Sequence, residues 1–332
     1  MQNFIRPTAR IIGTGSYVPE RVLTNQDLEK MVDTNDEWIV SRTGMKERRI
    51  ARSDEFTSDM GTAAAKKAIE AAQISVADLD LILFATHTPD YVFPSTASLI
   101  QAHLGASKAA ALDVQAACTG YLYVLAMAKA FIESGIYKNV LIVAADKVSS
   151  IVNYKDRNTC ILFGDGASAA VISSEGKGLT IGDVSLGSDG ELAKLVILPA
   201  GGSRQPATQE TVDCNLHYLQ MEGKEVFKHA VRRMESASKE ALEKAGLKET
   251  EISWLIPHQA NMRIIEALAK RFEVPMEKVF ITIHKYGNTS ASSVGIALDE
   301  LLRQNSVQKG ENILLTAFGA GLTWGASVLT HE

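Results

Sequence analysis

The strongest constraint on the fold is a set of uninterrupted apolar runs that alternate with helical patterns. The runs LDLILFATHT at 79–88, KNVLIVAADKV at 138–148 and GASAAVIS at 166–173 carry apolar residues at consecutive positions. A strand of this kind is buried on both faces, which requires helices on both sides of its sheet. An alanine-rich helical pattern at 59–74 precedes the first run. The sequence therefore predicts an α/β protein.

The second half of the chain repeats the plan of the first in the same order. EISWLIPHQAN at 251–261 corresponds to the run at 79–88, and ENILLTAFGAG at 311–321 corresponds to KNVLIVAADKV. GASVLT near the C-terminus matches GASAAVI. The pattern breaks at EGKG, so we expect two similar halves, 1–178 and 179–332. A functional site is expected where the halves meet.

Composition excludes several classes of protein. A net charge of −5 and a pI near 5.9 argue against a nucleic-acid-binding protein. The N-terminal segment lacks the apolar core of a signal peptide. The long uncharged run 312–330 is interrupted by glycines, which favours two strands and a turn over a membrane span. We therefore expect no membrane partner.

The cysteine and histidine spacing argues against metal or disulfide chemistry. The 3 cysteines are far apart and form no CxxC pair, so neither a disulfide framework nor a zinc site is expected, and a reducing cytoplasm fits. GTGSYV at 13–18 lacks the third glycine of a dinucleotide fingerprint. Six histidines have no partner at metal-ligand spacing and are interpreted as surface or hydrogen-bonded residues: His87, His103, His217, His229, His284 and His331.

Cys118, in the stretch AACTGYLY, is the first candidate for catalysis. Between Val114 and Phe131 only Lys129 is charged, so the helix that follows Cys118 should be buried. A cysteine at the first turn of such a helix lies at the positive end of the helix dipole, which lowers a thiol pKa. Taken alone, Cys118 is also compatible with a small core residue, because free cysteines are usually buried.

Two further stretches supply polar side chains at the ends of predicted strands. IPHQANMRII at 256–265 places His258 after an apolar strand, where open α/β sheets bind their ligands. YGNTSASS at 286–293 contains Asn288 and has the composition of a turn. It occupies the place in the second half that AACTGYLY occupies in the first. Superposed halves would bring Cys118 and Asn288 to equivalent helix starts, with His258 beside them.

A cysteine, a histidine and an asparagine that converge in this way predict nucleophilic acyl transfer. Two chemistries remain open at this point. In a papain-like hydrolase the histidine is a base that the asparagine orients. In a thiolase-like condensing enzyme the histidine and the asparagine both donate hydrogen bonds to a thioester oxygen. A non-catalytic thioester-binding protein is a third possibility, which the complete set of three residues disfavours.

The ordered set AACTGYLY, LFGDGASAAV, IPHQAN, YGNTSASS and FGAGLTWG, together with TNDEWIVSRTGMKERRI, resembles the β-ketoacyl-acyl carrier protein synthase III family. The resemblance runs from about Ile11 to Leu329. It implies a thiolase-like fold in which duplicated α/β halves form five αβαβα layers, and a homodimer. It also implies that an acyl-CoA acylates Cys118 and that malonyl-acyl carrier protein then condenses with the acyl group. No cofactor and no metal are implied beyond these thioester substrates.

The resemblance also carries over to binding residues. CoA contacts are implied at six positions: Trp38, Arg42, Arg157, Phe227, Asn261 and Ala320. Ala320 stands where many family members have glycine, and Thr119 stands where alanine or serine is common. Phe93 resembles the residue that crosses a dimer interface to close the acyl pocket. Acyl carrier protein is acidic, so basic positions are expected to face it, including Lys228, Arg232 and Lys270. The implied docking segment is QANMR, comprising Gln259, Ala260, Asn261, Met262 and Arg263.

Two alternatives to the initiating synthase remain. A related condensing enzyme of polyketide or quinolone synthesis would use the same three residues on another thioester. A Cys-His-Asn thioester hydrolase would use His258 as a base, but its cysteine is not expected in so apolar a helix. The sequence leaves the primer acyl group undetermined.

Overall fold

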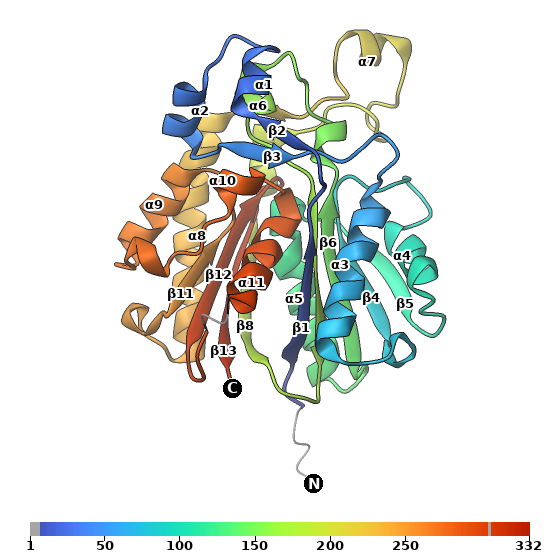
Figure 1. The fold of residues 1–332 in the computed structure, drawn as a ribbon, viewed down its shortest axis with the longest axis vertical. Coiled ribbons are helices and arrows are strands. Elements are labelled where there is room, and N and C mark those ends of the chain that lie inside the picture. The colour runs from blue at the N-terminus through green and yellow to red at the C-terminus, as the bar shows by residue number, and fades with distance from the viewer. Residues whose placement is uncertain (1–6, 305–306) are drawn as a thin grey trace.

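The computed structural model describes residues 7–304 and 307–332 and contains one large mixed sheet (Figure 1). Nine strands follow one another across it in the order β11-β12-β13-β8-β1-β7-β6-β4-β5. Their bounds are β1 Arg10–Tyr17, β4 Leu81–Ala85, β5 Ala110–Val114, β6 Asn139–Asp146, β7 Gly166–Ser173, β8 Leu179–Ser188, β11 Trp254–Pro257, β12 Asn312–Gly319 and β13 Thr323–His331. The α/β class predicted from the apolar runs is confirmed, and 312–330 forms the two predicted strands.

The two ends of the sheet are built to one pattern. β4 and β6 are parallel, β6 and β7 are antiparallel, and β7 and β1 are antiparallel. β11, β12, β13 and β8 repeat this sequence of pairings. Within the sheet, the two sections meet at β1 and β8, where Arg10 pairs with Thr180 and Ile11 with Leu179. The domain limits of 1–178 and 179–332 remain a prediction.

Helices cover both faces of each section and also lie between the sections. α3 (Thr57–Ala72) and α4 (Thr96–Leu104) cover the outer face of the first section, and α8 (Gly223–Ala245) and α9 (Met262–Arg271) cover that of the second. α5 (Gly120–Glu133) and α11 (Ser293–Arg303) contact strands of both sections (Figure 1). The order of layers is therefore helix, sheet, helix, sheet, helix, as the thiolase-like fold requires.

Strand residues alternate between these layers, which explains the uninterrupted apolar runs. In β4, Leu81 and Leu83 face the central helices, whereas Ile82 and Phe84 face α3 and α4. Each face of a strand meets helices, so every position is apolar.

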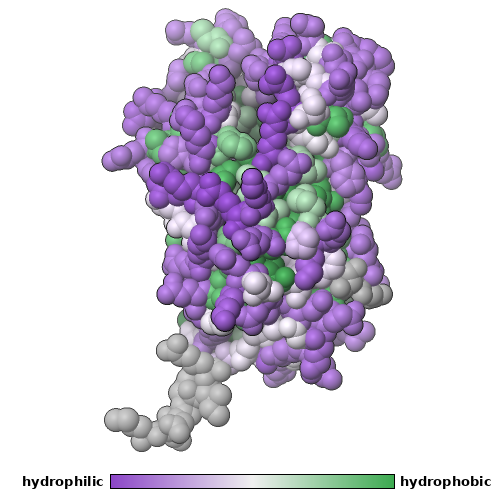
Figure 2. Space-filling view, turned by 90° about the vertical axis from the view of Figure 1, so that its left-hand side faces the viewer, coloured by the Kyte–Doolittle hydropathy of each residue, from purple (hydrophilic) through white to green (hydrophobic). Residues whose placement is uncertain are grey.

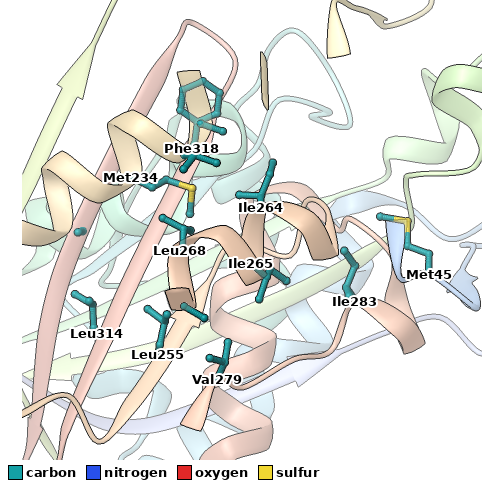
Figure 3. Close-up of a cluster of buried hydrophobic side chains, with 14 of the residues drawn as sticks. Met45, Met234, Leu255, Ile264, Ile265, Leu268, Val279, Ile283, Leu314 and Phe318 are labelled. Carbon is teal, nitrogen blue, oxygen red and sulfur yellow. The ribbon is translucent and has the colours of Figure 1, made fainter. Parts of the chain in front are cut away.

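The outer core of the second section is drawn in Figure 3. Leu255 from β11 and Leu314 from β12 lie beneath Leu268 of α9, and Met234 of α8 completes the contact. All four side chains are at most 1% exposed. At roughly 1.5–3 kcal/mol for each fully buried side chain of this size, this contact holds α9 firmly on the sheet.

A close approach at Gly295 brings the central helices together. A Cβ atom at this position would lie 2.2 Å from Ser168 Oγ and 2.6 Å from Tyr121 Cε2. α11 therefore packs directly on β7 and α5, and only glycine leaves the necessary room. This packing fixes the segment before α11, which carries Asn288, against the segment before α5, which carries Cys118.

Small elements surround the end of the sheet where the parallel strands finish (Figure 1). The strands and α-helices are β2 Val22–Thr24, α1 Asn25–Glu29, α2 Asp36–Thr43, β3 Glu47–Arg49, α6 Arg157–Cys160, β9 Val196–Ile197, α7 Gln209–Asp213, β10 Gln220–Met221 and α10 Ile283–Tyr286. The 3₁₀ turns at this end are η2 Ala117–Thr119, η3 Val148–Ser150, η4 Gly190–Leu195 and η7 Ser290–Ser292. Two others, η1 Val76–Asp78 and η5 Glu249–Glu251, directly precede the parallel strands β4 and β11 and therefore lie at the opposite end, and η6 Met276–Lys278 follows α9. Within residues 7–304 and 307–332, no helix has the length and apolar character needed to cross a bilayer.

Candidate active site

Cys118 lies in the 3₁₀ turn η2, directly before helix α5. Ala117, the first residue of this turn, has a left-handed φ of 45°. Burial restricts the turn, because Thr119 is fully buried and Cys118 is only partly exposed. The cysteine therefore occupies the predicted position at the start of a buried helix, although the turn that carries it is not yet α-helical.

The three predicted catalytic residues meet around the segment 288–293. The Ser290 hydroxyl donates to Cys118 Sγ at 3.5 Å. The Ser290 backbone N–H donates to Asn288 Oδ1 at 2.9 Å. Ser293 Oγ lies 2.6 Å from His258 Nδ1. One segment thus contacts Cys118, contains Asn288 and holds His258, as the convergence of the two halves predicts.

The correspondence between the two helix starts differs by three residues from the predicted one. Ser290 opens the turn η7 with a left-handed φ of 54°, as Ala117 opens η2 with 45°. Matching these turns aligns Cys118 with Ala291, and not with Asn288. Asn288 lies before its turn, so its side chain approaches the cysteine from the preceding loop.

The predicted low pKa of Cys118 is wrong. Burial raises the pKa of this thiol to about 11, and the nearby charge of Asp146 acts in the same direction. The hydrogen bond from Ser290 lowers the pKa, but it does not offset burial. The prediction considered the helix end alone and omitted desolvation, which favours the neutral thiol. Cys118 is therefore a thiol at neutral pH and must lose its proton when it reacts.

His258 and Asn288 are both neutral, and one polar atom of each side chain already has a hydrogen-bond partner. Burial lowers the pKa of His258 to about 3, and the side chain is nearly inaccessible at 2% exposure. Its Nδ1 contacts Ser293, which leaves Nε2 for a substrate. Asn288 Oδ1 accepts the Ser290 N–H, which leaves the amide NH₂ as a donor. A neutral imidazole and an amide can together donate two hydrogen bonds to one oxygen.

The end of β12 lies against the backbone of the nucleophile. A Cβ atom on Gly319 would lie only 2.7 Å from the Cys118 backbone nitrogen. Thr323 Oγ1 donates to the carbonyl oxygen of Ala116 at 3.1 Å and lies 3.0 Å from the carbonyl oxygen of Ala320. The turn 319–323 is therefore fixed to the cysteine turn.

Trp38, Arg42 and Arg157 form a cluster among the short helices and strands at the end of the sheet. Trp38 is carried by α2, where the side chain of Asn35 caps the helix by accepting the Trp38 N–H at 2.8 Å. The guanidinium of Arg42 lies 4.9 Å from the indole centroid, and that of Arg157 lies 4.7 Å from it. Arg157 also donates to the Asp33 carbonyl at 2.9 Å. The cluster that the resemblance assigned to CoA is thus assembled from two distant segments.

A shallow groove between α8 and α9 contains the next candidate, Phe227. This side chain is 38% exposed and lines the groove with Lys228, Arg232 and Arg271. Figure 2 shows the side of the molecule on which α2, α8 and α9 lie, and most of its surface is hydrophilic with apolar patches between the polar side chains. An aromatic ring among basic side chains suits a partner that is both anionic and partly apolar.

Only part of the QANMR segment, residues 259–263, is accessible at the surface, and Gln259 is buried. Gln259 is fully buried: its amide accepts the N–H groups of Thr282 and Ile283 and donates to the Pro257 carbonyl. It therefore supports the loop from inside, and its predicted place in an exposed docking surface is wrong. The error arose because sequence position alone cannot show which way an amide points.

The remaining residues of this segment lie nearer to the surface. Asn261 caps α9, since its side chain accepts the Arg263 N–H at 2.9 Å. Ala260 and Met262 pack against the buried core, and Met262 also abuts Gly44. Arg263 is exposed and donates to the Ser41 carbonyl at 3.4 Å.

Sequence reasoning missed one histidine beside the nucleophile. His87, which follows β4, lies 2.9 Å from the Asp146 carboxylate and 3.3 Å from Ser290 Oγ. It was interpreted as a surface or hydrogen-bonded residue because it lacked a partner at metal-ligand spacing. The signal that could have found it is position, since His87 follows a buried strand as His258 does. In the described part of the chain, no group of three or more potential ligand side chains could hold a metal ion.

Comparison with known proteins identifies the family. A family model described as 3-oxoacyl-[acyl-carrier-protein (ACP)] synthase III matches residues 112–190, and the model of its C-terminal part matches 242–331. The β-ketoacyl-[acyl-carrier-protein] synthase III of Chlamydia muridarum is 61% identical over 97% of this chain and 98% of the relative.

Solved structures agree with this result. The crystal structure of 3-oxoacyl-[acyl-carrier-protein] synthase III from Aquifex aeolicus is 50% identical, with a TM-score of 0.90 over 97% of this chain and 100% of that one. The priming β-ketosynthase of the R1128 polyketide pathway is 36% identical, with a TM-score of 0.91 over 100% of this chain and 99% of that one.

The fold and its relatives define a thiolase-like condensing enzyme, which is an acyltransferase. Within that class, the chain belongs to the β-ketoacyl-acyl carrier protein synthase III family, because relatives of that name match almost its whole length.

Proposed function

We propose that this protein catalyses the decarboxylative condensation of an acyl-CoA primer with malonyl-acyl carrier protein, which initiates fatty-acid synthesis. The observation that carries the proposal is the segment 288–293, which joins Cys118, His258 and Asn288 in one site. The product is a 3-oxoacyl-acyl carrier protein, and the reaction needs no cofactor besides its thioester substrates.

In the first half-reaction Cys118 receives the acyl group. Its sulfur forms a bond to the thioester carbonyl carbon, the bond from that carbon to the CoA sulfur breaks, and CoA takes up the proton that Cys118 loses. The transient oxyanion accepts hydrogen bonds from backbone N–H groups at Cys118 and in the turn near Ala320. The proximity of Gly319 to the Cys118 nitrogen supports this placement. Each donor contributes on the order of 3 kcal/mol to the transition state.

In the second half-reaction the malonyl thioester loses carbon dioxide. Negative charge develops on its thioester oxygen, where His258 Nε2 and the Asn288 amide donate. The pKa of about 3 supports this role, because a neutral His258 can donate without first gaining a proton. The resulting carbanion forms a bond to the acyl carbon on Cys118, and the bond from that carbon to the sulfur breaks. The Cys118 thiolate that leaves takes up a proton from water.

We propose the binding surfaces from the resemblance, and the positions of their side chains support the proposal. Trp38, Arg42 and Arg157 take the adenine and phosphates of CoA, because guanidinium groups pair with phosphate and an indole stacks on a base. Phe227 and Asn261 lie along the path of the pantetheine. The acidic carrier protein docks on Arg263, on Lys228 and Arg232, which line the groove between α8 and α9, and on Lys270, which is exposed on α9.

We also propose that two chains form a homodimer through the β5 edge of the sheet, in a cytoplasmic enzyme. β5 is the last strand of the sheet, and Leu112 within it is 37% exposed. The nearby loop exposes Val92 at 92% and Phe93 at 85%. Large apolar side chains exposed in this way suit burial in a partner, where Phe93 would close the acyl pocket.

One experiment tests the central proposal. The protein is incubated with a panel of acyl-CoAs, the mass of the Cys118 peptide is followed, and malonyl-acyl carrier protein is then added. Stable acylation, followed by carbon dioxide release only with the malonyl substrate, is expected. A Cys118→Ala variant should still decarboxylate the malonyl thioester, whereas a His258→Ala variant should lose about 100-fold or more in this step. Rapid hydrolysis of the acyl group without malonyl substrate would instead establish a thioester hydrolase.

The similarity to the R1128 priming enzyme keeps one related function open. Carrier proteins of fatty-acid and polyketide type, each loaded with malonyl groups, separate the two. A strong preference for the polyketide carrier would move the proposed function to polyketide priming.

A further inference from the structure

A buried ion pair lies beside the nucleophile, at a place that the reaction described above does not use. β4 and β6 are parallel neighbours, so His87 after β4 meets Asp146 at the end of β6. His87 Nδ1 lies 2.9 Å from Asp146 Oδ1, and the two side chains are 16% and 0% exposed. Asp146 is therefore fully buried, and His87 is largely buried.

The carboxylate of Asp146 is firmly held as an anion. Its Oδ1 accepts the hydroxyls of Thr86 and Thr88, each at 3.0 Å, and the His87 backbone N–H at 2.9 Å. Its Oδ2 accepts the Ala291 N–H at 3.3 Å, from the turn next to Cys118. Burial acts to raise the pKa of Asp146, but the charge and hydrogen bonds of His87 and the Thr86 hydroxyl lower it overall.

The proton positions follow from this anion. An ionised carboxylate only accepts, so His87 Nδ1 carries a proton. The same Nδ1 lies 3.3 Å from Ser290 Oγ. Ser290 can therefore only accept from Nδ1, and its own hydroxyl proton is directed to Cys118 Sγ, 3.5 Å away. His87 thus determines that the Ser290 hydroxyl is a donor toward the sulfur.

His87 also changes the electrostatic field at Cys118. The charge of Asp146 opposes a thiolate there, whereas the Ser290 hydrogen bond favours one. Burial acts to lower the pKa of His87, but the charge and hydrogen bond of Asp146 raise it overall, which favours imidazolium. The groups that face His87 are Asp146 from β6 and, across Ser290, the titratable Cys118 of η2. An imidazolium at His87 compensates the charge of Asp146, which opposes a thiolate at Cys118.

We propose that His87 is a positioning residue for acylation: paired with Asp146, it holds the Ser290 hydroxyl on Cys118 Sγ and stabilises the thiolate that attacks the acyl-CoA. This inference rests on the proposed function for its acylation step. It assigns no role to His87 in decarboxylation, which belongs to His258 and Asn288.

The direct test is the rate of Cys118 alkylation by iodoacetamide between pH 6 and 11, since only the thiolate reacts. A Cys214→Ser background removes the exposed cysteine, and peptide mass spectrometry reports on Cys118 alone. His87→Leu should raise the apparent pKa of Cys118 and so slow alkylation at pH 7 about tenfold. His87→Asn, which keeps a donor but no charge, should recover part of this loss.

Two controls separate positioning from general damage. His103→Leu removes an exposed histidine, whose Nδ1 lies 3.4 Å from Thr62 Oγ1, and should leave the alkylation curve unchanged. In a Cys118→Ala background, His87→Leu should leave malonyl decarboxylation within about twofold. A thermal melt of each variant checks that it is folded.

A double-mutant cycle tests whether His87 acts through Ser290. His87→Leu should have a smaller effect in a Ser290→Ala background, because the contribution through the hydroxyl is gone and only the effect of the His87 charge remains. An unchanged alkylation curve in His87→Leu would overturn the inference, and so would an equal effect with and without Ser290. Alkylation does not require acyl transfer. If the shifted curve appears but no acyl-CoA acylates Cys118, then the proposed function fails while the assignment of His87 stands.

Discussion

Replacement of Gly319 by alanine tests whether the end of β12 fixes the nucleophile. The added Cβ would lie 2.7 Å from the Cys118 nitrogen, 3.1 Å from the Thr119 nitrogen and 3.2 Å from Cys118 Cβ. An ordinary contact begins at 3.4 Å, so β12 and the cysteine turn must separate by about 3.4 − 2.7 = 0.7 Å. Both segments are buried parts of the sheet and the central layer, so neither moves freely.

The magnitude combines two opposing effects. Overpacking in a close-packed interior costs about 1–3 kcal/mol. Alanine also restricts the unfolded chain, which returns about 0.4–1 kcal/mol because Gly319 does not need a left-handed φ. The expected net loss of stability is about 1–2 kcal/mol. A displacement of the reacting sulfur by up to about 0.7 Å should slow acylation about 10-fold or more.

Urea unfolding and rapid-quench acylation of Cys118 measure the two quantities. Gly190→Ala is a matched control, because a Cβ there meets nothing within 4 Å, and both quantities should stay close to those of the original protein. A Gly319→Ala variant that acylates at the original rate would refute the argument that this contact positions the sulfur.

Three further predictions follow from the site. Trp38→Ala should raise KM for acyl-CoA about tenfold with little change in kcat, measured by steady-state kinetics; a loss confined to kcat would contradict a binding role. Gln259→Leu should destabilise the protein by about 2–5 kcal/mol in urea unfolding, since two buried N–H groups, at Thr282 and Ile283, lose their acceptor. His258 has a folded pKa of about 3, so the unfolded state binds more protons as pH falls below about 6.5, and stability should fall by up to about 1.4 kcal/mol per pH unit. His258→Gln should lack this component in denaturation measured at pH 7 and pH 5.

Much of the fold and the catalytic set was determined by the sequence. The apolar runs specify strands buried on both faces, because consecutive apolar positions such as Leu81 and Ile82 can only be satisfied by helices on both sides. The repeat of those runs placed Cys118, His258 and Asn288 at the ends of corresponding segments. These features depend on local pattern and order, which a sequence contains directly.

Tertiary structure alone decided what surrounds those residues. Gln259 points inward because its amide oxygen accepts the N–H groups of Thr282 and Ile283, more than twenty residues away in the chain. The pKa of Cys118 rose because the fold buried the sulfur near Asp146, against the effect expected from the helix end. His87 became a neighbour of Ser290 because β4 and the turn before α11 meet across the two halves. Burial, nearby charge and the direction in which a hydroxyl donates are set by atoms distant in sequence. Local sequence patterns therefore identified the reacting groups but could not predict the environment that controls them.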